Sequence, residues 1–149
     1  MHRRLFMTTL SGIVMIHVGC DRGDARRSGA GQESESLPKL GAELGVQFPP
    51  STQLMGVKRY NGMDDAVLIK LEIAGTEFPS FMAQTRIDPA AIRPGTRGLL
   101  GQDEGFWDPH QSPSLRTGQI SRPDARAMNV GFDDSRGDVV VVYVMEHGT

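Results

Sequence analysis

Apolar and polar side chains alternate along two stretches of the chain with the two-residue period of a β-strand. In residues 66–73, AVLIKLEI, every second side chain is apolar, and charged residues enter the other set toward the end. This pattern predicts a half-buried antiparallel strand with four residues on one face: Val67, Ile69, Leu71 and Ile73. In residues 138–147, DVVVVYVMEH, both alternating sets are apolar. Because both faces of such a strand need cover, we expect it in the interior of a sheet.

Residues 53–60, QLMGVKRY, predict a third strand, with Met55 and Val57 on one side and Lys58 and Tyr60 on the other. Asn61-Gly62 follows at once and favours a tight hairpin turn, because both residues accept positive φ angles. The acidic pair Asp64-Asp65 lengthens the connection, so a longer loop is the alternative.

Helical spacing appears in three short segments. Residues 37–44 are amphipathic, and residues 77–85 carry an apolar stripe that follows Thr76 as the predicted N-cap. Asp88 and Pro89 predict a further short helix that stops at Pro94-Gly95. From residue 96 to residue 123, Gly and Pro recur between few apolar anchors, which predicts a long loop.

Residues 127–132, AMNVGF, complete the predicted elements as a strand followed by a turn over 133–137. The order is then strand, strand, helices, loop, strand, strand. We expect an α+β fold, in which short helices pack on one face of a small antiparallel sheet of about four strands in ββααββ order. Residues 37–149 are predicted to form this single domain.

The start of the chain has the layout of a secretory signal. Arg3 and Arg4 precede a mostly apolar stretch over residues 5–18. At about 1.5 Å per helical residue this stretch reaches only about 21 Å, short of the roughly 30 Å core of a bilayer. We therefore do not expect a permanent membrane-spanning helix.

Val18-Gly19-Cys20 resembles the lipobox of bacterial lipoproteins, although His17 stands where that family usually has Leu. The resemblance implies that residues 1–19 are a cleaved signal peptide. It also implies that Cys20 is acylated and anchors the chain to the extracytoplasmic face of the cell membrane. Asp21 resembles the signal for retention in the inner membrane. An ordinary cleaved signal peptide and an uncleaved anchor are the alternatives.

The segment after Cys20 favours a flexible linker, because residues 21–36 are rich in Gly, Ser and charge and have no hydrophobic periodicity. The first 20 residues hold two of the 16 Lys and Arg and none of the 18 Asp and Glu, which leaves 14 against 18 and a formal charge of about −4. This balance argues against a nucleic-acid partner. Cys20 is the only cysteine, so we expect no intramolecular disulfide.

Three patterns after Cys20 could carry chemistry, and each has a simpler interpretation. Asp108, His110 and Ser112 alternate like a catalytic set, but triads assemble from distant segments, so we interpret them as polar loop residues. The acidic pairs at 64–65, 103–104 and 133–134 could hold Ca²⁺ or perform glycoside acid/base chemistry, but neighbouring residues on a strand point to opposite faces, which argues against paired function. Residues 133–138 do not match the calcium-loop spacing and are interpreted as a turn, so no metal site is expected. Arg22-Gly23-Asp24 and Arg136-Gly137-Asp138 resemble the integrin-binding tripeptide, which arises easily by chance in turns.

Phe106 and Trp107 are the candidate binding residues, because a large rigid ring on a polar loop can anchor a protein or a sugar. In the alternative interpretation, Trp107 folds back and covers the sheet. Neither interpretation involves catalysis.

The domain also loosely resembles small bacterial lipoproteins of unknown function, through FPPST at 48–52, LIKLEI at 68–73 and the Phe-rich helix that follows. The sequence thus favours a non-enzymatic envelope lipoprotein, without a cofactor, whose domain binds another envelope protein. The alternative is a small-ligand or cell-wall glycan binding module that uses Phe106 and Trp107.

Overall fold

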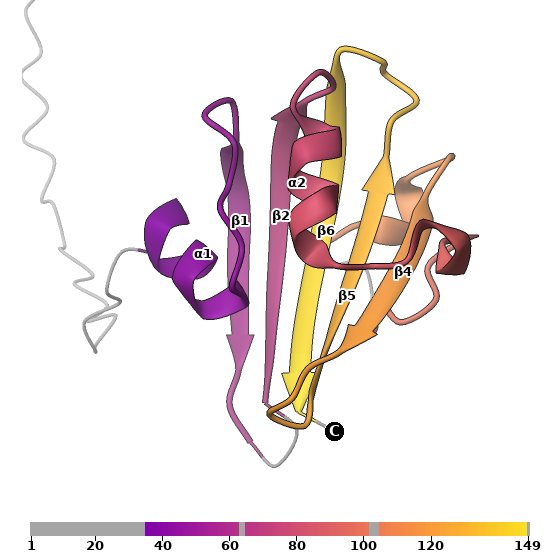
Figure 1. Cartoon of the computed structure of the whole chain (residues 1–149). Coiled ribbons are helices and arrows are strands. Elements are labelled where there is room, and N and C mark those ends of the chain that lie inside the picture. Colours follow the sequence, from indigo (N-terminus) through magenta and orange to yellow (C-terminus); the bar gives the residue numbers. More distant parts are fainter. Residues whose placement is uncertain (1–34, 63–64, 102–104, 149) are drawn as a thin grey trace, which may run out of the picture. The chain divides into compact units, whose positions relative to one another are not determined.

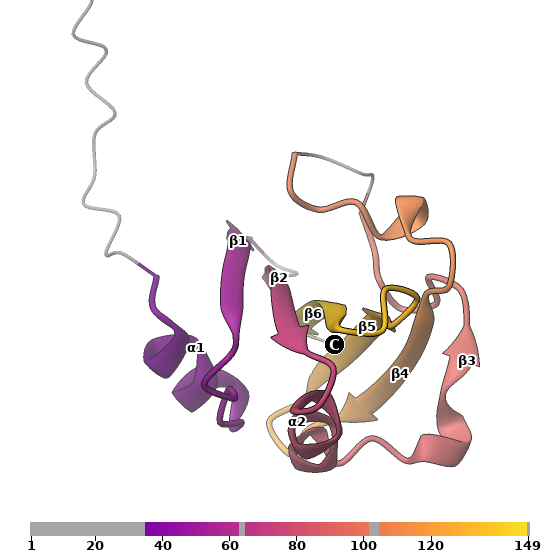
Figure 2. The same cartoon turned by 90° about the horizontal axis from the view of Figure 1, so that it is seen from above.

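The computed structural model describes residues 35–62, 65–101 and 105–148, which all belong to the compact unit Gln32–Thr149. The predicted signal peptide, Cys20 and the linker as far as residue 34 lie outside the described residues. Six antiparallel strands form one sheet in the order β1-β2-β6-β5-β4-β3 (Figure 1; β3 is labelled in Figure 2). Their bounds are β1 Gln53–Tyr60, β2 Ala66–Ala74, β3 Arg93–Pro94, β4 Arg116–Ser121, β5 Arg126–Asp133 and β6 Val139–Gly148.

The predicted α+β fold with about four strands in ββααββ order is wrong. The sheet has six strands, and α1 (Leu37–Leu44) and α2 (Phe78–Thr85) are the α-helices of the described residues, so the domain is mostly β. The missed strand β4, RTGQIS, contains a glycine and four polar side chains and shows little apolar alternation. It is a strand because it pairs with β5 along its whole length, from Arg116↔Phe132 to Ser121↔Ala127.

β6 lies between β2 and β5, as its two apolar faces predict. On one side of the sheet, α1 and α2 cover a core built from alternate residues of β2, β5 and β6 (Figure 2). The predicted face of β2 is buried there: Val67, Ile69, Leu71 and Ile73. The predicted third helix is a 3-10 turn, Pro89–Ala91, whose N-cap Asp88 accepts a hydrogen bond from the backbone N–H of Ala90 at 2.9 Å. Glu77, not the predicted Thr76, is the N-cap of α2.

The long connection between β3 and β4 covers the opposite side of the sheet (Figure 2). It places Leu99, Trp107 and Leu115 against a second buried set from β2 and β6, namely Ala66, Leu68, Tyr143 and Met145. The predicted loop 96–123 therefore supplies half of the cover that β6 requires. We call these two sides the helix face and the loop face.

A β-bulge in β1 changes which of its side chains face inward. The register with β2 shifts between Leu54 and Gly56, so that Leu54 and Val57 pack on the helix-face core. Met55, predicted to share a face with Val57, is 47% exposed instead. Gly56 then faces the ring of Phe106, since a Cβ atom there would lie 2.3 Å from the Phe106 Cγ.

Candidate functional site

A polar cavity of about 280 Å³ lies at the end of the sheet where β1 leaves and β2 enters. Its walls come from α1, from the strands β1, β2, β5 and β6 and from two connections, so it forms only when these elements are assembled. We call it the Glu146 pocket. It is lined by Glu43, Arg59, Tyr60, Asn61, Asp65, Ala66, Val67, Asp124, Arg126 and Glu146.

Glu146 is the most deeply buried charged group of the pocket, with a side chain that is 3% exposed. It lies near the end of β6 and pairs with Val67 of β2 and Met128 of β5, so it shares the helix face with them. Arg122 approaches its carboxylate at 2.8 Å (Nη1) and Arg126 at 3.5 Å (Nε). Burial raises the pKa of Glu146, and the two guanidinium groups oppose this rise.

Arg122 also joins the sheet to α1. Its Nη1 donates to the carbonyl oxygen of Leu44 at 3.0 Å and its Nη2 to that of Glu43 at 3.3 Å. These are terminal carbonyl groups of the helix, which lack partners within it and carry its negative dipole end. One guanidinium therefore caps α1 and neutralises the buried carboxylate of Glu146.

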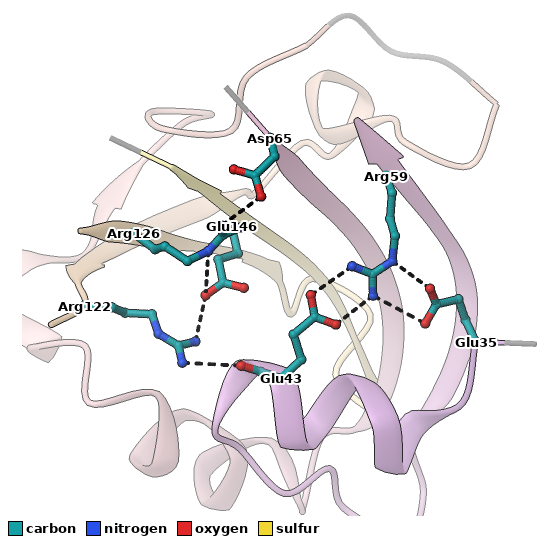
Figure 3. A network of polar contacts seen from close by, with 7 residues as sticks. All are labelled: Glu35, Glu43, Arg59, Asp65, Arg122, Arg126 and Glu146. Atoms are coloured by element: carbon teal, nitrogen blue, oxygen red, sulfur yellow. Dashed lines mark hydrogen bonds and ion pairs between the residues drawn. The ribbon is translucent and has the colours of Figure 1, made fainter. Parts of the chain in front are cut away.

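Two further arginines complete the network (Figure 3). Arg126 pairs with Asp65 at 2.9 Å, at the start of β2. Arg59, on β1, lies between Glu43 (Nη2–Oε2, 2.7 Å) and Glu35 (Nε–Oε1, 2.7 Å). The hydrogen bond from Arg59 is the largest of the causes that lower the pKa of Glu43, and the two carboxylates raise the pKa of Arg59.

The lining of the pocket carries more negative than positive charge. It has four carboxylates and two guanidinium groups, a formal charge of −2 when all are ionised. Within the described ranges, no group of three or more His, Cys, Asp and Glu is arranged to hold a metal ion. The excess of carboxylates gives the pocket a negative potential that attracts cations.

The structure places the predicted binding residues Phe106 and Trp107 on the loop face. Trp107 is 1% exposed and meets the ring of Tyr143 edge to face, with 5.5 Å between ring centroids. Phe106 packs over Gly56 and is partly buried. This geometry matches the covering interpretation of Trp107. Binding through these two rings stays a prediction, and it requires the loop to leave the sheet.

Two of the three alternating loop residues meet at the hydroxyl of Tyr143. That hydroxyl donates to Asp108 Oδ1 at 2.7 Å and lies 3.1 Å from Ser112 Oγ. Asp108 also forms an ion pair with Lys70 of β2 at 2.5 Å. The group fastens the loop to β2 and β6 and so holds Trp107 in place. His110, on the short helix Pro109–Gln111, borders a separate cavity beside Ser112.

The acidic pairs that the structure describes take part in turns and ion pairs. Asp133 accepts hydrogen bonds from the backbone N–H groups of Ser135 (2.9 Å) and Ser114 (3.5 Å), and Asp134 pairs with Arg116. Arg136 of the second tripeptide pairs with Glu72 at 2.9 Å. The first tripeptide, Asp64 and the pair at 103–104 lie outside the described residues.

Sequence reasoning missed the Glu146 pocket, although one signal for it exists. Glu146 is in phase with Val140, Val142 and Val144, which are buried on the helix face. A charged side chain among alternating buried residues needs a partner of opposite charge. Arg122 and Arg126 flank the turn between β4 and β5 and supply this partner.

Comparisons with protein-family models, with curated proteins and with solved structures find no match to this chain. Within the part of the chain that the structure describes, no helix is long and apolar enough to cross a membrane.

Proposed function

We propose that this chain is a non-enzymatic envelope lipoprotein, anchored to the membrane through Cys20, whose domain binds another envelope protein. The partner inserts one basic side chain, Lys or Arg, into the Glu146 pocket. The observation that carries this proposal is the charge of the cavity: four carboxylates against two guanidinium groups around about 280 Å³.

The size of the pocket supports a single side chain as its occupant. Pockets that bury drug-sized ligands have about 300–1,000 Å³, so this cavity falls just below that range. Asp65 and Asp124 are exposed and Glu146 is buried, so an incoming ammonium or guanidinium group would meet the two aspartates first. Because Glu146 is buried with its pKa raised, an added cation also stabilises its ionised form.

The alternative, a small-ligand or glycan module based on Phe106 and Trp107, has less support. Trp107 lies in the core of the loop face, and the polar group around Tyr143 fastens its loop to the sheet. A sugar could stack on the Trp107 ring only after the contacts of Asp108 are broken.

Binding is tested by NMR titration of the protein with N-acetyl-arginine methylamide, and with N-acetyl-glutamine methylamide as the neutral control. We expect shifts of Asn61, Asp65 and Asp124 amides with the arginine compound alone. Asp65→Asn should weaken the binding several-fold without unfolding the domain, because the Asp65 side chain is 53% exposed. Glu72→Gln is the matched control, since its ion pair with Arg136 lies away from the pocket. Equal shifts with both compounds would refute the cation site.

Anchoring is tested separately by feeding cells an alkyne analogue of palmitate and fractionating them. The wild-type chain should carry the label and sediment with membranes, whereas Cys20→Ala should lose the label and leave the membrane fraction. A label that persists in Cys20→Ala would contradict acylation at this residue.

A further inference from the structure

The edge of the sheet at β4 is only partly covered by β3. β3 pairs with Arg116 and Thr117 and then ends. The backbone N–H of Gly95 donates to the carbonyl oxygen of Leu115 on this outer side, and that of Arg122 donates to Arg126 of β5 on the inner side. Because backbone groups alternate along a strand, the N–H and C=O groups of Gln119 and Ser121 also point outward. Beyond β3, the short helix Pro89–Ala91 is the neighbour of β4. Among the described residues, none forms a backbone hydrogen bond with the outward groups of Gln119 and Ser121, so these groups can pair with an added strand.

A second cavity, of about 310 Å³, lies along this open edge. It is lined by two arginines and no acidic residue, namely by Ala91, Arg93, Arg97, Thr117, Gly118 and Gln119. Arg93 donates to the backbone carbonyls of Ala90 (2.6 Å) and Ile92 (2.8 Å). No described residue forms a hydrogen bond or an ion pair with the guanidinium of Arg97.

The position of Arg97 fits the side chains of an added strand. Its neighbour Gly98 lies against Asn129 on the loop face, where a Cβ atom would come within 2.5 Å of Asn129 Oδ1. Thr117, Gln119 and Asn129 project to that same face, since Gln119 pairs with Asn129 across the ladder. A strand beside β4 would therefore point every second side chain to the loop face, where one of them can reach Arg97.

We propose that the β4 edge binds an extended acidic segment of a partner polypeptide, which adds a strand beside Gln119–Ser121 and places a carboxylate on Arg97. Main-chain hydrogen bonds supply the docking, and the Arg97 ion pair selects acidic over neutral or basic sequences. This inference does not depend on the Glu146 pocket, because the two cavities share no residue.

The opposite edge of the sheet is a poorer template. β1 contains the bulge between Leu54 and Gly56, and bulges interrupt the regular spacing that strand addition needs. The guanidinium of Arg59 there is already held by Glu35 and Glu43. We therefore expect a peptide to bind at the β4 edge and not at the β1 edge.

The test uses two blocked heptapeptides of alternating residues, one of Thr and Glu and one of Thr and Lys, titrated into the ¹⁵N-labelled full chain. We expect the Glu peptide alone to bind, with shifts and slowed amide exchange at Gln119 and Ser121. Binding of both peptides, protection on β1 instead of β4, or no binding of the Glu peptide at millimolar concentration would each overturn the proposal.

Variants separate the ion pair from the backbone contacts. Arg97→Ala should weaken binding of the Glu peptide about fivefold, the effect of one exposed ion pair worth about 1 kcal/mol. Gln119→Pro should abolish the slowed exchange, because proline removes an outward N–H that the ladder with β5 does not use. Lys58→Ala, on the far edge, should leave the affinity unchanged. Unchanged affinity in Arg97→Ala would show that Arg97 does not select the ligand.

Discussion

Replacing Arg122 by alanine should cost this domain more stability than any exposed ion pair can. The substitution removes the 2.8 Å contact to Glu146 and both hydrogen bonds to the end of α1. Breaking a buried ion pair from one side costs about 3–5 kcal/mol, because the remaining charge is left without compensation. The lost interaction with the helix dipole adds about 0.3–1 kcal/mol.

The remaining contact of Glu146 to Arg126 at 3.5 Å keeps the expected loss near the lower end of that range. We therefore expect the free energy of unfolding to fall by about 3 kcal/mol at pH 7.5, and Tm to fall by about 10 °C. Urea unfolding followed by circular dichroism measures the first quantity. Arg136→Ala is the matched control: its pair with Glu72 is exposed, with 56% of the arginine side chain accessible, and should cost under about 1 kcal/mol.

The pH dependence of the stability loss in Arg122→Ala distinguishes the cost of an uncompensated charge from the cost of lost packing. The folded-state pKa of Glu146 is raised, so its ionised form opposes folding, and this penalty disappears as the pH falls and the carboxyl group takes up a proton. The loss caused by Arg122→Ala should therefore be smaller at pH 5 than at pH 7.5. Adding Glu146→Gln should recover part of the lost stability, since the double variant has no uncompensated charge. Equal losses at both pH values would refute the electrostatic reasoning.

Three further outcomes follow from the packing and the charges. Gly56→Ala should lower the stability by about 1–3 kcal/mol in urea unfolding, because the new methyl group overlaps the ring of Phe106, whereas Gly62→Ala should have little effect. Trp107 is the only tryptophan, so the folded protein should emit at short wavelength and resist iodide quenching; emission typical of a solvated indole would contradict its burial. Burial raises the pKa of Asp133, but the hydrogen bonds from Ser135 and Ser114 lower it by more, so the net pKa is below the ordinary value. Ionised Asp133 therefore stabilises the fold at pH values above its ordinary pKa, and this contribution is lost as the pH falls through the lowered folded-state pKa. Asp133→Asn should lose less stability than the wild type when unfolding is measured across this acidic range.

The strands that the sequence predicts are those whose own side chains decide their structure. Residues 66–73 and 138–147 alternate strongly, and β2 and β6 match them to within a residue at each end. β4 could not be predicted in this way, because its strand geometry comes from pairing with β5 along its whole length. The two-residue strand β3 contains Pro94 and depends on β4 in turn.

The candidate site was harder to predict than the sheet. Its charged residues are far apart in the sequence, and only the strand order brings Asp65, Arg126 and Glu146 to one end. The alternation in β6 places Glu146 on a buried face, which indicates that a partner is needed but not which one. The role of Trp107 likewise depended on where its loop lies, and loop residues carry no periodicity that fixes this.

The place of β6 has a consequence for how the chain is made. β6 is the last of the described strands in the sequence and lies between β2 and β5 in the sheet. Ala66 pairs with His147 and Ala74 with Val139, so these contacts close only after nearly all the described chain has been synthesised. Without β6, the edges of β2 and β5 that it joins have no partner strand. Contacts of such long range form slowly. We therefore expect the insertion of β6 between β2 and β5 to be the slow step in the folding of this domain.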